Sequence, residues 1–203
     1  MHASERTPTL TILGIDPGSV VTGIGVIAQQ GRRMRLVHAG FLRAEVKEPF
    51  HERLLYLHKA LDQLLQDHEV DEVSVETPFY GVNVKSLMQM CHARGSLLAA
   101  VARHGIPVHE YAPREIKKAV VGNGNASKEQ VVFMVKQALK DAVFEEDWPL
   151  DVTDAIATAL CRAHRLGNRV VGVDDGSTVS FADRLIAAGA TTEAARRAQR
   201  GVR

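Results

Sequence analysis

The chain has little cysteine, few aromatic residues and almost no net charge. Only 2 of its 203 residues are cysteines, which favours free thiols over a disulfide or a metal site. Cys91 and Cys161 each lie among apolar residues at helical spacing, so we expect both to be buried. No apolar run is long enough to cross a bilayer, and residues 1–8 lack the apolar stretch of a signal peptide. We therefore expect a soluble, cytoplasmic protein with no membrane partner.

The near balance of 25 basic and 24 acidic residues does not by itself indicate a nucleic-acid partner. The basic residues are nevertheless concentrated between Ala112 and Lys140, where Glu115 and Glu129 are the acidic exceptions. This segment contains Arg114, Lys117, Lys118, Lys128, Lys136 and Lys140. Such an excess either binds phosphates or forms an ordinary solvated helix face, and composition does not distinguish the two.

The length suits one domain that buries its own core, with chain left over at both ends. We expect a flexible N-terminal extension at 1–8, a folded domain at 9–165 and a partly disordered C-terminal extension at 166–203. Turn residues are frequent and helical periodicity is weak after Arg165, and the chain ends in several arginines. A disordered tail, a DNA tether and a partner-binding arm all remain open for this segment.

Hydrophobic periodicity predicts an α/β fold with a five-stranded mixed sheet flanked by helices. Three strands joined by the turns Pro17-Gly18 and Gln30-Gly31 should form an antiparallel meander. A leucine-rich helix then leads to a strand ending at Glu76, which a helical crossover makes parallel to its neighbour. The predicted strands are 9–16, 22–28, 34–43, 73–76 and 108–111, and the predicted helices include 83–104, 113–121, 127–141 and 151–165.

Two acidic residues end predicted strands. Asp16 follows the apolar run Leu10-Thr-Ile-Leu-Gly-Ile and precedes a Pro-Gly turn, and Glu76 follows Val73-Ser-Val and precedes Thr-Pro78. An acid at such a position is rigidly held and faces solvent. Taken singly, Asp16 is also explained as a turn cap and Glu76 as an ordinary charge at a strand end.

A second pair of acids opens the last predicted helix. Asp151 and Asp154 are three residues apart, and the apolar residues that follow recur at helical spacing, so both acids share one face of the first turn. The helix dipole favours anions there, yet their mutual repulsion calls for a cation. Asp151 alone is also a plausible N-cap after Pro149. Together the four acids predict a site for hard cations such as Mg²⁺ or Mn²⁺.

Residues 12–27, Ile12-Leu-Gly-Ile-Asp16-Pro-Gly-Ser-Val-Val-Thr-Gly-Ile-Gly-Val-Ile27, resemble the opening of RuvC, a family of bacterial Holliday junction resolvases. The resemblance covers about residues 9–165 and implies an RNase H-like fold. Later segments resemble that family in the same order, namely Val75-Glu-Thr-Pro-Phe79-Tyr-Gly-Val-Asn83, Ala93-Arg-Gly95, Glu110-Tyr-Ala-Pro-Arg-Glu-Ile-Lys117-Lys118, Val120-Val-Gly-Asn-Gly124 and Asp151-Val-Thr-Asp154-Ala.

The resemblance implies a homodimeric endonuclease that binds four-way junction DNA and acts with a branch-migration motor. Its catalytic metal ligands would be Asp16, Glu76, Asp151 and Asp154, holding two Mg²⁺ ions, with Mn²⁺ as a substitute. The DNA contacts it implies are Lys117, Lys128 and the aromatic Phe79, to which Tyr80, Arg114 and Lys118 are added as weaker candidates. For Phe79, a hydrophobic lid on the following helix is the alternative. We expect Met88, Met90 and Leu97 to face partly outward and form the dimer contact.

Three other functions are weighed against this prediction. A structural junction binder with a dead active site would have lost acids, and all four remain. An actin-like ATPase would need a second phosphate-binding glycine loop, for which Gly122-Asn-Gly124 is a weak candidate. A different RNase H-like nuclease that acts on RNA hybrids or flaps stays open, because loops and dimer geometry determine the substrate.

Overall fold

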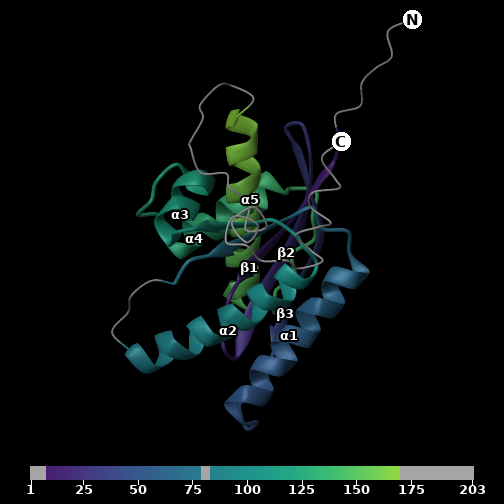
Figure 1. The fold of residues 1–203 in the computed structure, drawn as a ribbon. Coiled ribbons are helices and arrows are strands. Elements are labelled where there is room, and N and C mark those ends of the chain that lie inside the picture. The colour runs from purple at the N-terminus through teal and green to yellow at the C-terminus, as the bar shows by residue number, and fades with distance from the viewer. Residues whose placement is uncertain (1–7, 79–82, 170–203) are drawn as a thin grey trace, which may run out of the picture.

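The computed structural model describes residues 8–78 and 83–169, which form a sheet with helices on both sides (Figure 1). Its strands are β1 (Leu10–Asp16), β2 (Val21–Gln30), β3 (Arg33–Arg43), β4 (Glu72–Glu76) and β5 (Val108–Tyr111). Its helices are α1 (Phe50–Asp67), α2 (Val84–Arg103), α3 (Pro113–Val121), α4 (Lys128–Ala138) and α5 (Leu150–Arg169).

The five strands lie in the order β3-β2-β1-β4-β5. β1 pairs antiparallel with β2, and β2 pairs antiparallel with β3, so the first three strands form the predicted meander. β4 pairs parallel with β1 and with β5. The predicted mixed sheet is therefore confirmed, including the parallel addition of the Glu76 strand beside β1.

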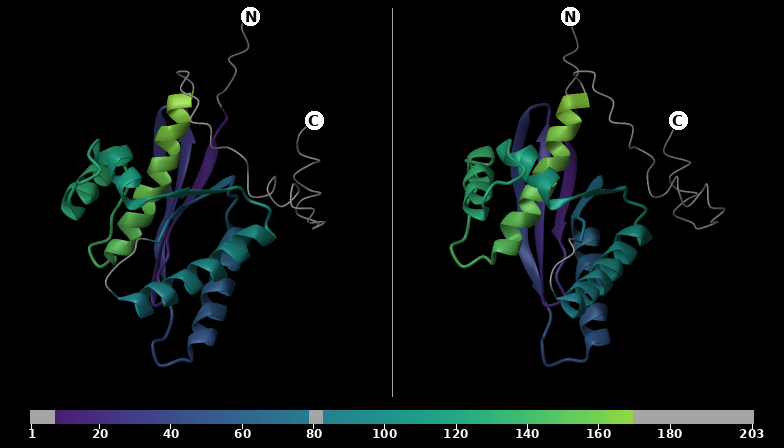
Figure 2. Two further views of the ribbon diagram at one scale, coloured as in Figure 1. Left: turned by 60° about the vertical axis from the view of Figure 1, so that its left-hand side comes forward. Right: turned by 90° about the vertical axis from the view of Figure 1, so that its left-hand side faces the viewer.

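Helices cover the two faces of the sheet in separate groups (Figure 2). On one face α5 lies directly on the strands and α3 and α4 pack outside it, around buried Ile12, Val135 and Ile156. On the other face α1 and α2 cover a second core that includes Leu57 and Leu97. The two cores share the sheet because its residues alternate between the faces.

Glycines bring α5 unusually close to the central strands. A Cβ atom on Gly14 would lie 2.0 Å from the carbonyl oxygen of Ala155, and one on Gly23 would lie 1.9 Å from that of Asp151. No other residue fits at such distances, because a side chain would overlap the helix backbone. These glycines therefore determine how near the acidic start of α5 lies to the end of β1.

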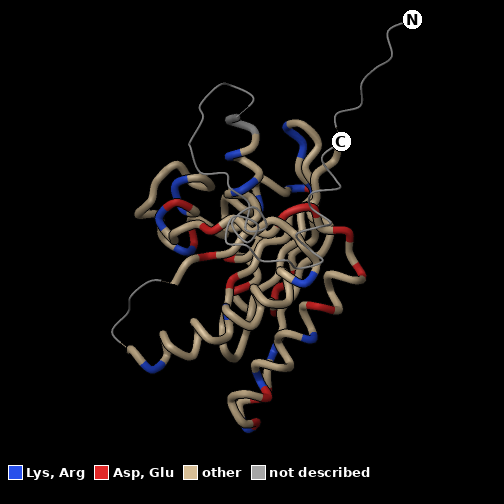
Figure 3. Tube along the Cα trace, in the orientation of Figure 1, with Lys and Arg blue, Asp and Glu red and all other residues tan. Residues whose placement is uncertain are grey.

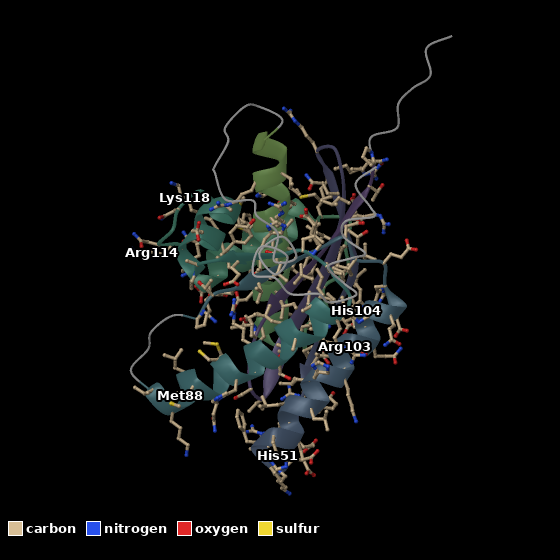
Figure 4. All side chains as sticks on the ribbon, viewed as in Figure 1. His51, Met88, Arg103, His104, Arg114 and Lys118 are labelled. Atoms are coloured by element: carbon tan, nitrogen blue, oxygen red, sulfur yellow. The ribbon has the colours of Figure 1, made fainter. Side chains whose placement is uncertain are left out.

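The expected burial of α2 is wrong at Cys91 and Leu97. Met88 faces outward as expected (Figure 4) and is 56% exposed. Cys91 is exposed, so only Cys161 is the buried thiol that we expected. Leu97, expected to face partly outward, is buried. The buried residues of α2 begin at Ala93, and its N-terminal part projects beyond the strands (Figure 1).

Helix ends differ from the predicted ones by a few residues. α4 begins at Lys128, after Ser127 caps its first turn by accepting a hydrogen bond from the Gln130 amide, and it ends at Ala138. α5 continues through Arg169, past the predicted end at 165. The predicted extensions at 1–8 and 166–203 lie mostly outside the described residues. Within the described ranges, no helix is both long and apolar enough to span a bilayer.

Candidate active site

Asp16 and Glu76 lie at the same edge of the sheet, each at the end of its strand. β1 and β4 are parallel neighbours with Ile15 opposite Val75, so the next residue of each strand is an acid. Each strand core is apolar and buried, and each strand ends at these partly buried acids. The carboxyl ends of adjacent parallel strands are where an α/β sheet presents functional groups.

The N-terminal turns of α5 bring Asp154 to the same place. Asp154 lies on the second turn of the helix, and its Oδ2 is 3.3 Å from the Nζ of Lys128 at the start of α4. Ser127 and Gln130 form a reciprocal capping box that orients this start of α4. The ion pair thus joins α4 to α5 through two residues that are 26 positions apart in the sequence.

A cavity of about 290 Å³ lies where these elements meet. Asp151, the remaining predicted acid, is not part of its lining, although its charge acts on Asp16. The lining consists of Asp16, Glu76, Pro113, Ile116, Lys117, Lys128, Val131, Asp154 and Ala157. Three predicted acids and the two foremost predicted lysines therefore share one cavity.

The acids in this cavity perturb one another strongly. Burial, followed by the charges of Glu76, Asp154 and Asp151, raises the pKa of Asp16 to about 8. Burial, followed by the charge of Asp154, raises the pKa of Glu76 to about 7. Lys128 opposes both shifts, and Asp154 in turn raises the pKa of Lys128. The cavity therefore carries more negative charge than its lysines compensate, so it favours protons or added cations.

The donor chemistry fits a hard divalent cation. The acids offer only carboxylate oxygens, which suit Mg²⁺ or Mn²⁺ rather than soft metals. Among residues 8–78 and 83–169, however, no three acidic, histidine or cysteine side chains are grouped so as to hold one metal ion. In this arrangement Asp154 is held by Lys128 at 3.3 Å, so its carboxylate has a cationic partner from the protein itself.

The weaker candidates for DNA contact lie away from the cavity. Lys118 and Arg114 are on the outer side of α3 (Figure 4). Arg114 donates a hydrogen bond to Oδ1 of Asn125 at 3.0 Å and so stabilises the loop between α3 and α4. Acidic and basic residues are interspersed in that part of the fold (Figure 3). Phe79 and Tyr80 lie outside the described residues.

Arg94 is a residue near the site to which we assigned no role from the sequence. Its Nε donates a hydrogen bond at 3.3 Å to the carbonyl oxygen of Glu76, and its guanidinium lies 2.7 Å from Oε2 of Glu110. In the sequence, Ala93-Arg-Gly95 stands out only as part of the family resemblance. Helical periodicity alone gives no signal for a contact between α2 and the end of β4.

Comparison with solved structures gives the class of the fold. RuvC from T. thermophilus, solved in complex with a Holliday junction substrate, superposes with a TM-score of 0.72 and 32% sequence identity, covering 78% of this chain and 95% of that one. The yeast mitochondrial Holliday junction resolvase Ydc2 shares the fold at a TM-score of 0.59 and 14% identity, covering 83% and 87%. The sheet order and the acids at its edge define an α/β protein of the RNase H-like class, as predicted.

Sequence comparison gives the family. The family model described as crossover junction endodeoxyribonuclease RuvC matches residues 12–162, and this chain belongs to that family. The RuvC protein of Chlorobium phaeovibrioides is 40% identical over 159 residues, which are 78% of this chain and 83% of that protein. The RuvC protein of Helicobacter pylori strain J99 is 42% identical over 160 residues, which are 79% and 100% of the two chains.

Proposed function

We propose that this protein is a metal-dependent endonuclease that resolves Holliday junctions in homologous recombination and DNA repair by paired, symmetric nicks. Its family and its 40% identity to a crossover junction endodeoxyribonuclease support this activity. The observation that carries the proposal is the cavity that Asp16, Glu76 and Asp154 share with Lys117 and Lys128. Such a cavity attracts cations to its acids and a phosphate to its lysines at one place.

We assign the metal to the acids of this cavity, as Mg²⁺ with Mn²⁺ as a substitute and two ions per site. The raised pKa of Asp16, about 8, supports the assignment because it reflects burial and, after it, the negative charge of the neighbouring acids. Asp16, Glu76, Asp151 and Asp154 would hold the ions. Bound there, divalent cations supply a water of lowered pKa and neutralise charge on the leaving 3′ oxygen.

The lysines stabilise the reacting phosphate. Lys128, whose Nζ lies 3.3 Å from Asp154, and Lys117 of α3 both line the cavity, so two ammonium groups stand beside the acids. Preorganised positive charge stabilises the negative charge that a phosphate gains in the transition state. We assign no side chain as general base, and the expected products carry a 5′-phosphate and a 3′-hydroxyl.

The partners follow from the symmetry of the substrate. A four-way junction has two-fold symmetry, so two symmetric nicks require a two-fold dimer. We assign Phe79 to stacking on an unpaired base at the junction centre, with Tyr80 as a weaker candidate for DNA contact. The homodimer and a branch-migration motor as a further partner are part of the proposal.

Cleavage of synthetic substrates tests the function. Wild type and Asp16→Asn would be incubated with a mobile four-way junction, a linear duplex, an RNA–DNA hybrid and a flap, each with Mg²⁺, Mn²⁺ or EDTA. We expect paired nicks in the junction alone, dependent on metal and lost in Asp16→Asn, which should still bind the junction. Preferential cutting of hybrid or flap would contradict the substrate assignment, and tight binding without cutting in either metal would indicate a structural junction binder.

A further inference from the structure

Arg94 forms a bridge from α2 to the two strands beside the active-site cavity. Its Nε donates to the main-chain oxygen of Glu76 at 3.3 Å, and its guanidinium pairs with Glu110 of β5 at 2.7 Å. The Arg94 side chain is only 14% exposed, whereas that of Glu110 is 51% exposed. The contact with Glu110 is an ion pair by distance, without hydrogen-bond geometry, so the directional contact of this largely buried guanidinium is the hydrogen bond to Glu76.

The bridge acts where β4 ends and the chain leaves the sheet. Glu76 is the last residue of β4 and lies opposite Tyr111 of β5. Beyond it, Thr77 donates its amide to the Tyr111 carbonyl at 2.9 Å, and the ladder stops there. The Glu76 carbonyl that receives the Arg94 hydrogen bond therefore belongs to the residue whose carboxyl enters the cavity.

Arg94 lies where the buried part of α2 begins. The buried residues of α2 begin at Ala93, and Val84 and Met88 further back are 51% and 56% exposed. Arg94 is thus the point at which the projecting part of α2 is joined to the strand that carries Glu76. The hydrogen bond from Arg94 reaches the main-chain oxygen of Glu76, so the bridge acts on the position of the main chain.

We propose that Arg94 is a positioning residue, which fixes the end of β4 so that the Glu76 carboxyl is presented to the metal and phosphate in the cavity. This inference rests on the proposed function and adds a residue to its machinery. A residue that does not bind the metal itself but holds a metal ligand in its orientation typically raises metal affinity or activity by a factor of about 10–100.

The test compares Arg94→Lys and Arg94→Met with Arg103→Met. Arg103 lies on the same helix and contacts Asp62 at 3.7 Å, with its side chain 65% exposed and away from the cavity (Figure 4). Mn²⁺ binding to DNA-free protein would be measured from the electron spin resonance of free Mn²⁺, and junction cleavage would be followed as kcat and KM. All measurements would be made below the melting temperature of each variant.

We expect Arg94→Met to weaken Mn²⁺ binding and lower kcat by about 10–100-fold while KM for the junction changes less than about threefold. Arg94→Lys should retain part of the Mn²⁺ affinity and part of the kcat that Arg94→Met loses. Arg103→Met should match wild type in both quantities. Unchanged Mn²⁺ affinity and kcat in Arg94→Lys and Arg94→Met would overturn the proposal and leave Arg94 a structural ion pair. Wild type is assayed beside them: if it binds Mn²⁺ but does not cut junctions, the proposed function fails, while the Mn²⁺ measurement still decides the role of Arg94.

Discussion

Nζ of Lys128 lies 3.3 Å from Oδ2 of Asp154, and this ion pair joins the start of α4 to the acidic end of α5. The lysine side chain is 61% exposed and the aspartate 23% exposed. Exposed pairs of this kind contribute little to stability. We therefore attribute the importance of Lys128 to its place in the cavity with Asp16 and Glu76, where it lowers the pKa values that burial raises.

Replacing this lysine should impair catalysis more than folding. We expect Lys128→Met to lower the single-turnover cleavage rate by about 100-fold, because a preorganised positive charge beside the phosphate is lost. Lys140→Met is the matched control, since Lys140 is exposed and follows the far end of the same helix. Equal rates for the two variants at saturating protein would contradict the role of Lys128.

Removing one acid should stabilise the metal-free protein. The pKa of Asp16 is raised from 3.8 to about 8, so at pH 7 the folded protein keeps a proton that the unfolded chain releases. That mismatch destabilises the folded state at every pH above 3.8, and Asn removes it. In EDTA we expect Asp16→Asn to gain about 1–3 kcal/mol in the free energy of unfolding.

Thermal unfolding in EDTA and in excess Mg²⁺ checks this expectation. Mg²⁺ should raise the melting temperature of wild type, since a ligand bound to the folded state alone stabilises it, and should raise that of Asp16→Asn much less. The exposed Asp147 provides the control Asp147→Asn, which should behave as wild type in both conditions. A lower melting temperature of Asp16→Asn in EDTA would show that burial and the neighbouring acids do not penalise the Asp16 carboxylate.

The close approach of α5 to β2 should make Gly23 intolerant of any side chain. A Cβ there would lie 1.9 Å from the Asp151 carbonyl oxygen, so Gly23→Ala must displace the start of α5. We expect a loss of at least about 2 kcal/mol in urea denaturation and a marked loss of cleavage, because overpacking moves the acids. Gly40→Ala, whose Cβ would have His38 as its nearest neighbour at 3.8 Å, should cost far less.

Acid should weaken the fold through Glu72. Arg162, only 5% exposed, donates to both oxygens of Glu72, at 2.6 and 3.0 Å. The nearby His109, 3.7 Å away, and the hydrogen bonds from Arg162 together outweigh burial and lower the pKa of Glu72 from 4.5 to about 2. A depressed acid pKa gives stability that is complete above pH 4.5 and disappears as the pH falls toward 2.

Glu72→Gln isolates this effect. At pH 7 we expect it to lose about 3 kcal/mol relative to wild type, because Arg162 is left buried without its charged partner. At pH 3 the difference should shrink, since the unfolded wild-type chain has by then bound a proton at Glu72 that the folded protein, with its pKa of about 2, mostly lacks. Urea denaturation at both pH values measures it, with the exposed Glu69→Gln as control. A difference that stays constant from pH 7 to pH 3 would refute the linkage.

Local sequence patterns predicted the sheet and the helices well, because the hydrophobic period of a strand and that of a helix are both properties of short segments. The end of β1 at Asp16 and the end of β4 at Glu76 are as expected, and so is their parallel pairing. The exposure of Cys91 was not predicted, because an apolar helical pattern does not say where the helix leaves the sheet.

The available chemistry can be read from the sequence alone: acids at two strand ends and at the start of a helix, and lysines in the segment between. Which of these residues meet depends on the packing of the fold. Gly14 and Gly23 bring α5 onto the strands, Lys128 contacts Asp154 across 26 positions, and Arg94 contacts the carbonyl of Glu76. These contacts join residues far apart in the chain, so they depend on how the layers pack, which no local periodicity contains.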